Sequence, residues 1–180
     1  FLTDLKGYDV VLGKLVSSSL ASFYGLLAML PVLGLTIILG GVSGRELVRV
    51  ALVLLNTLFF SLAAGVFVSA ISRAERRALS ATFGLILLVT LGPFPLAIYY
   101  TYGLGGPGSP LQMAFLTPSP LFAFQLARSS GLLGPAVPDL FYSLVTTHLI
   151  GWWLLGLAVV VLPRTFQERP AGMVRLRWRE

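Results

Sequence analysis

Long runs of apolar residues separated by short polar stretches dominate this chain. Four intervals contain no Asp, Glu, Lys or Arg: residues 15–44, 50–72, 78–127 and 140–163. A transmembrane helix needs about 20 mostly apolar residues, because at about 1.5 Å per residue these cross a hydrocarbon core of about 30 Å. Each interval is long enough for one crossing. The pattern therefore predicts an all-α integral membrane protein, a polytopic helical bundle.

Glycine, proline and charged residues divide the chain into four predicted transmembrane helices. These are expected at about residues 15–40, 50–72, 78–100 and 139–162. Pro31 lies inside the first span, which a membrane helix tolerates where neighbouring groups satisfy the freed backbone. Pro93 and Pro95 are expected to bend or end the third span. The alternative is a second crossing within residues 78–127, which would give five spans.

The segment between the third and fourth spans, residues 101–138, has the composition of a loop. It is rich in glycine and proline, which favour turns over a buried helix. We expect it to be an extracytoplasmic loop. Within it, PLFAFQLAR at residues 120–128 predicts a short helix in the membrane interface. Nine residues are too few to cross a bilayer.

The small number of charges changes the picture from a soluble domain to a membrane protein with a defined sidedness. Charged residues make up 11% of the chain, whereas about a quarter is usual in soluble domains. The net charge of +6 would also suit a nucleic-acid-binding protein. However, the charges flank the apolar runs, which is the pattern of a protein whose partner is a lipid bilayer, and we expect no nucleic acid to bind.

The distribution of Lys and Arg predicts the orientation in the membrane, because short cytoplasmic loops hold the excess of positive charge. Placing the N-terminus in the cytoplasm puts ten of the 13 Lys and Arg residues inside and leaves Arg45, Arg49 and Arg128 outside. Both termini are then cytoplasmic, with an amphipathic segment over residues 1–14 and a basic tail over 163–180. Five spans would place that tail outside, which the same rule disfavours.

Three polar residues inside the spans are candidates for lining a translocation path: Asn56, Thr57 and His148. Polar residues at this depth usually face a bundle interior or a water-filled cavity. For Asn56 and Thr57 the first interpretation is a hydrogen bond between helices, and the second is a cavity lining. His148, the single histidine, is first interpreted as a packed, neutral, hydrogen-bonded imidazole. The alternative is a contact with a proton or a substrate.

The candidate chemistry of the chain is sparse. It has no cysteine, one histidine and no carboxylate in the four uncharged intervals, so a metal site or proton relay has few components. A Gly-x-Ser-x-Gly nucleophile motif is missing. Residues 7–14 end in Gly-Lys, but Leu15 stands where a nucleotide-binding loop has Ser or Thr. We therefore expect no catalytic, metal or cofactor-binding residue here, and any ATP to be hydrolysed by another polypeptide.

Small residues recur at every fourth position in the first and second spans. The two ladders are Ser17, Ala21 and Gly25, and Ser61, Gly65 and Ser69. Such ladders let helix backbones approach closely. We expect packing within the chain, and the alternative is an interface between subunits.

The opening segment, FLTDLKGYDVVLGK, is amphipathic and leads directly into the first span. It resembles the segment before the third span in permeases of the type-2 ATP-binding-cassette (ABC) family. The matching residues are Leu2, Thr3, Leu5, Leu12, Gly13 and Lys14. Asp4 stands where that family often has proline. More loosely, the resemblance covers the whole chain, with a long outer segment before the last span and a basic cytoplasmic tail.

The resemblance implies a transmembrane permease subunit of an ATP-driven exporter in the cell membrane. Alternating access would be powered by ATP bound to a separate ABC ATPase subunit, and a second permease half would complete the transporter. By comparison with the family, two spans and a coupling helix would precede Phe1. The residues expected near the ATPase contact are Asp4, Lys6, Tyr8, Asp9 and Lys14. A secondary transporter or channel is the main alternative, and a membrane-embedded enzyme is a weaker one.

Overall fold

The computed structural model describes residues 7–72, 74–105, 110–128 and 136–166, and all regular secondary structure in these ranges is helical. Four stretches are long and apolar enough to cross a membrane: Tyr8–Met29, Gly44–Ile71, Arg76–Gly103 and Pro138–Leu162. The predicted all-α class is confirmed, as is the presence of four helices able to span a membrane.

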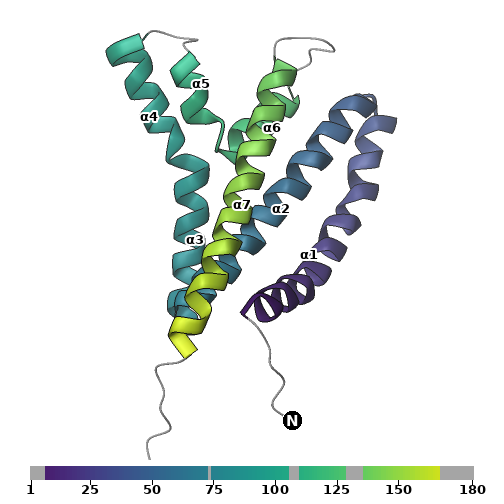
Figure 1. Ribbon diagram of the computed structural model, residues 1–180. Coiled ribbons are helices and arrows are strands. Elements are labelled where there is room, and N and C mark those ends of the chain that lie inside the picture. The colour runs from purple at the N-terminus through teal and green to yellow at the C-terminus, as the bar shows by residue number, and fades with distance from the viewer. Residues whose placement is uncertain (1–6, 73, 106–109, 129–135, 167–180) are drawn as a thin grey trace, which may run out of the picture.

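The helices form a bundle in which both ends of the described chain lie on the same side. They are α1 (Gly7–Ile38), α2 (Gly44–Ile71), α3 (Glu75–Leu91), α4 (Pro93–Tyr100), the π-helical turn η1 (Thr101–Gly105), α5 (Pro110–Leu116), α6 (Pro120–Arg128) and α7 (Ala136–Phe166). Figure 1 shows the start of α1, the α2–α3 connection and the end of α7 together at one end of the bundle. The cytoplasmic location of that end stays a prediction.

Helices α2 and α7 form the centre of the fold and share its most extensive contact. Their interface is built largely from alanines, of which Ala63, Ala64 and Ala158 are completely buried. Small side chains allow close helix approach, and this matters in a membrane because lipid tails are as apolar as leucine and leave packing as a main source of association. The other helices pack around this pair.

Local signals explain where α1 ends and α2 begins. Gly40 adopts a φ of 73°, which favours glycine, and it directs the chain out of α1. Ser43 is the N-cap of α2, and its hydroxyl accepts a hydrogen bond of 3.3 Å from the backbone N–H of Glu46. The Ser-x-x-Glu spacing is a typical helix start.

The third membrane-spanning stretch is interrupted between α3 and α4, as Pro93 predicted. Proline has no N–H and cannot continue the helical hydrogen-bond ladder. A Cβ on Gly92 would collide with the carbonyl oxygen of Leu88, so glycine is required at this position. The carbonyl of Thr90 accepts a 2.7 Å hydrogen bond from the Ser119 hydroxyl. The backbone next to the interruption therefore accepts a hydrogen bond from a side chain that is distant in the sequence.

Helices α5 and α6 form a short hairpin that enters the bundle from the end opposite the start of α1 (Figure 1). Its turn is held from both sides, because Ser119 bonds to α3 and the Ser143 hydroxyl of α7 donates to the Thr117 carbonyl at 2.7 Å. Ser119 and Ser143 are completely buried. Between residues 101 and 138, the part of the chain that the structure describes is thus largely helical.

The predicted helix over residues 120–128 is confirmed by α6, and its position in the membrane interface stays a prediction. Ala123 and Ala127 are buried against Val53 of α2 and Leu140 of α7. Their spacing of four residues places both on one helix face. One apolar face of α6 is therefore buried in the bundle.

The ladder Ser17, Ala21 and Gly25 is not used for packing within the described chain. All three residues are exposed, and a Cβ on Gly25 would meet nothing within 4 Å. The second ladder does face a neighbour, since a Cβ on Gly65 would lie 3.9 Å from the Thr82 methyl of α3. The expectation of packing within the chain is therefore wrong for the first ladder and fits the second.

Candidate functional site

The structure brings Asn56 of α2 and His148 of α7 into direct contact, although they lie 92 residues apart in the chain. The Asn56 side-chain oxygen is 3.0 Å from Nδ1 of His148. Asn56 Nδ2 donates a 3.0 Å hydrogen bond to the backbone carbonyl of Leu144, also in α7. The predicted interhelical role of Asn56 is confirmed.

The hydrogen-bond partners fix the tautomer of His148. The Leu144 carbonyl only accepts, so it must face the Asn56 amide nitrogen, and the Asn56 oxygen then accepts from Nδ1–H. On the other side of the ring, Trp152 Nε1–H donates to His148 Nε2 at 3.0 Å. An indole nitrogen only donates, so Nε2 carries no proton. Both geometries describe a neutral imidazole with each nitrogen paired, as the first interpretation of His148 expected.

Aromatic packing holds the imidazole ring against α2. The ring of Phe59 stacks on His148 with a centroid distance of 4.5 Å, and Trp152 lies 5.5 Å from Phe59. Gly151 makes room for this arrangement, because a Cβ there would be 2.6 Å from Phe59 Cε1. We call Asn56, Phe59, His148 and Trp152 the α2–α7 cluster.

Thr57 does not join the α2–α7 cluster. Its hydroxyl donates to the Val53 carbonyl of its own helix at 2.8 Å. Thr146 and Thr147, which directly precede His148, likewise donate to the carbonyls of Tyr142 and Ser143. Of the three predicted path-lining residues, the structure therefore joins two and leaves the third bonded within α2. Their lining of a path stays a prediction.

The described residues contain no group of three or more His, Cys, Asp or Glu side chains that could hold a metal ion. The hydrogen-bond partners of His148 are Asn56 and Trp152. Ser17, Ser18 and Ser19 donate to carbonyls of their own helix, α1. The α2–α7 cluster can fix the positions of α2 and α7 relative to each other, and it leaves the side chains of His148 and Trp152 exposed.

A second candidate region is the beginning of α1, which contains part of the predicted ATPase contact. Asp4 and Lys6 lie outside the described residues. Tyr8 is exposed, Asp9 is partly buried, and Lys14 is exposed with its ammonium group hydrogen-bonded to the Ser69 hydroxyl of α2. The expected amphipathic segment is continuous with the first span from Gly7 onward, because α1 contains both.

Val11 anchors this region to the centre of the bundle. It is 3% exposed and belongs to a cluster with Ala70 of α2 and with Leu155 and Ala158 of α7. The neighbouring residues Val10 and Leu12 are exposed. The first turns of α1 therefore contact the same two helices that carry the α2–α7 cluster.

Trp152, Ser119 and Ser143 were not among the predicted site residues. Trp152 had a recognisable signal, because it follows His148 by four residues and so shares its helix face. For Ser119 and Ser143, the local sequence contains no sign of the distant carbonyls that they bond.

Searches of protein-family models, curated proteins and solved structures found no match to this chain. The function is therefore inferred from the geometry described above and from the opening segment.

Proposed function

We propose that this chain is the membrane-spanning part of a permease that exports a substrate by alternating access, driven by a separate ABC ATPase subunit. The proposal is supported by four helices able to span a membrane and by the resemblance of the opening segment to type-2 ABC permeases. A second permease half would complete the translocation path in the cell membrane.

The observation that carries the proposal is the packing of Val11. Helix α1 continues without interruption from Gly7 through Lys14 into the apolar span. A force applied to its first turns therefore reaches the bundle through a rigid element. Because Val11 is buried against both α2 and α7, a displacement there is transmitted to those helices. This is the connection that an external ATPase needs in order to move transmembrane helices.

The α2–α7 cluster is the proposed element that keeps the two central helices moving together. Asn56 makes two contacts with α7, at Leu144 and His148, and Phe59 adds a third by stacking on His148. The remaining exposed surface of His148 is the proposed lining of the path. Substrate contact at this position would involve an imidazole edge and aromatic rings rather than a charge.

The alternative of an ion-coupled secondary transporter predicts that His148 exchanges protons during transport. In the structure both ring nitrogens are hydrogen-bonded. A second proton on Nε2 would place it opposite the Trp152 N–H, so the bond between these side chains would be lost. This arrangement favours a structural role for His148 over a proton-exchanging one.

The proposal is tested by purifying the full-length protein together with ATP-binding subunits encoded near it and reconstituting them in vesicles. We expect a stable complex in which the permease changes the ATPase rate. Val11→Asp, which places a charge against α7, should uncouple ATP hydrolysis from transport, whereas Val10→Asp should have a smaller effect because Val10 is 44% exposed in the same first turns of α1. Transport by the purified permease without any ATPase would contradict the proposal.

A further inference from the structure

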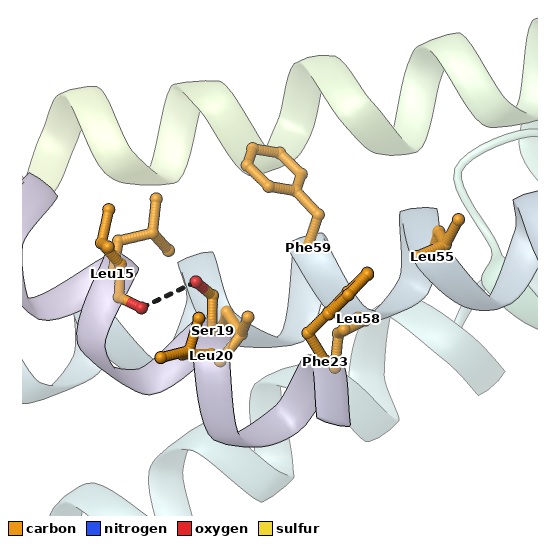
Figure 2. A pocket seen from close by; sticks show the side chains of 9 residues that line it. Leu15, Ser19, Leu20, Phe23, Leu55, Leu58 and Phe59 are labelled. Carbon is orange, nitrogen blue, oxygen red and sulfur yellow. Dashed lines mark hydrogen bonds between the residues drawn. The ribbon is translucent and has the colours of Figure 1, made fainter. Parts of the chain in front are cut away.

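An apolar groove lies between α1 and α2 and is open along the side of the bundle (Figure 2). Its volume is about 300 Å³. Its walls come from both helices: Leu15, Val16, Ser19, Leu20 and Phe23 of α1, and Leu55, Leu58, Phe59 and Leu62 of α2. A groove of this size is at the lower end of the range for small-molecule sites.

The groove offers a ligand almost no polar contact. Ser19 is its one polar wall residue, and the Ser19 hydroxyl already donates to the Val16 carbonyl at 2.9 Å. Figure 2 shows leucine and phenylalanine side chains from the two helices around the space. The chemistry of these walls fits a hydrocarbon chain and does not fit a charged or strongly hydrogen-bonding ligand.

The positively charged side chain of Lys14 lies beside the groove, on the side nearest the start of α1. Leu55, Leu62 and Ser69 are spaced by seven residues and so share one stripe of α2. Ser69 accepts a hydrogen bond from Lys14, which directly precedes the wall residue Leu15. The Lys14 side chain is exposed. An ammonium group has three donors, so two remain beyond the bond to Ser69.

We propose that this groove binds a membrane phospholipid with an anionic headgroup. One acyl chain occupies the space between α1 and α2, and the headgroup phosphate pairs with Lys14. A lysine near the end of a membrane-spanning helix directs its charged group toward the interface, where lipid phosphates lie. The proposal does not depend on the transport function proposed above.

The two halves of the site have different roles. The groove walls are no more apolar than the surrounding lipid, so they select by shape rather than by the hydrophobic effect. The choice among headgroups comes from Lys14, because a basic side chain near the membrane surface attracts anionic lipids. An acyl chain in the groove also touches Phe59, which stacks on His148. The lipid therefore contacts the α2–α7 cluster.

The test uses the full-length protein in nanodiscs made from equal amounts of phosphatidylglycerol and phosphatidylcholine, followed by native mass spectrometry of the lipid that the released protein retains. We expect retained phosphatidylglycerol to exceed phosphatidylcholine. Lys14→Gln should reduce this preference about fivefold, the ratio that corresponds to about 1 kcal/mol for one basic side chain. Lys14→Arg should keep the preference.

The groove itself is tested by Leu58→Trp, which fills it. Leu88→Trp is the matched control, because Leu88 lies on α3 and is 67% exposed. We expect loss of both retained lipids in the first variant and unchanged retention in the second. Equal retention of the two lipids by the unmodified protein would overturn the proposal. So would an unchanged phosphatidylglycerol preference in Lys14→Gln, which is informative even if Leu58→Trp does not fold.

Discussion

Helix α1 and the α2–α7 pair differ in where several of their polar side chains find partners. In α1, the hydroxyls of Ser17, Ser18, Ser19 and Ser22 donate to carbonyls of the same helix. In the α2–α7 pair, Asn56, His148 and Leu144 form hydrogen bonds from one helix to the other. The first arrangement leaves a helix independent of its neighbours, and the second fastens two helices together.

Burial shows the same contrast. Only 6% of the first span is buried, compared with 28% of the second and fourth spans. Beyond its first turns, α1 can shift against the bundle without breaking the side-chain hydrogen bonds described above, other than the one from Lys14 to Ser69. The comparison teaches that polar residues in a membrane helix indicate attachment only when their partner lies on another helix.

The strongest expected disruption of the α2–α7 pair comes from Gly151→Ala. Its new methyl group would lie 2.6 Å from Phe59 Cε1, so the ring must move and its stacking on His148 is disturbed. Overpacking of this kind destabilises by about 1–3 kcal/mol. Thermal unfolding in detergent, followed by near-ultraviolet circular dichroism of the aromatic residues, should show a lower Tm.

The matched control for this prediction is Gly156→Ala in the same helix. A Cβ at Gly156 would meet nothing within 4 Å, so its Tm should not fall. If both variants unfold at the same temperature, close contact at Gly151 does not hold the two helices together.

A somewhat smaller effect is expected for Asn56→Leu. The substitution removes the bonds to Leu144 and His148, and interhelical hydrogen bonds in membranes contribute about 0.6–2 kcal/mol. A double-mutant cycle with His148→Phe measures the coupling between the two side chains. Thr57→Val is the comparison variant and should change stability less, because the Thr57 hydroxyl is bonded within α2. Additive effects of Asn56→Leu and His148→Phe would show that the pair is not coupled.

The smallest of the three effects concerns the one apolar anchor of α1. Val11→Ala removes two methyl groups from a site that is 3% exposed, and we expect a loss of about 1 kcal/mol. Val16→Ala, at 63% exposure, should change the free energy of unfolding by less than about 0.5 kcal/mol. Equal losses at the two positions would mean that α1 is held along its length, contrary to the comparison above.

Much of the fold follows from hydropathy alone, because a membrane imposes a minimum length on each crossing. Hydropathy predicts less well where each helix begins and ends. α1 begins at Gly7 and α2 at Gly44, earlier than the predicted spans, since a helix continues beyond the apolar region while its backbone hydrogen bonds are favourable. Of the hairpin of α5 and α6, only the helix at residues 120–128 was predicted. It depends on Ser119 and Ser143 bonding to carbonyls distant in the sequence.

The candidate site was predictable as a set of residues but not as an arrangement. Asn56 and His148 stood out as polar residues in apolar spans. Their contact depends on the relative height of α2 and α7, which run in the same direction through the bundle (Figure 1). The two residues are equally far from Gly44 and Ala136, the first residues of these helices. Counted from the predicted starts at residues 50 and 139, the two residues are not equally far along their spans, so the contact was not predicted.

The interruption between α3 and α4 has a consequence for movement within the third span. In an uninterrupted helix a change of direction stretches backbone hydrogen bonds on one side. Here the Thr90 carbonyl is paired with the hydroxyl of Ser119, which is completely buried and also accepts a hydrogen bond from the Phe122 backbone N–H. A bend between α3 and α4 must therefore move Ser119 and the start of α6 along with Thr90, or break this hydrogen bond.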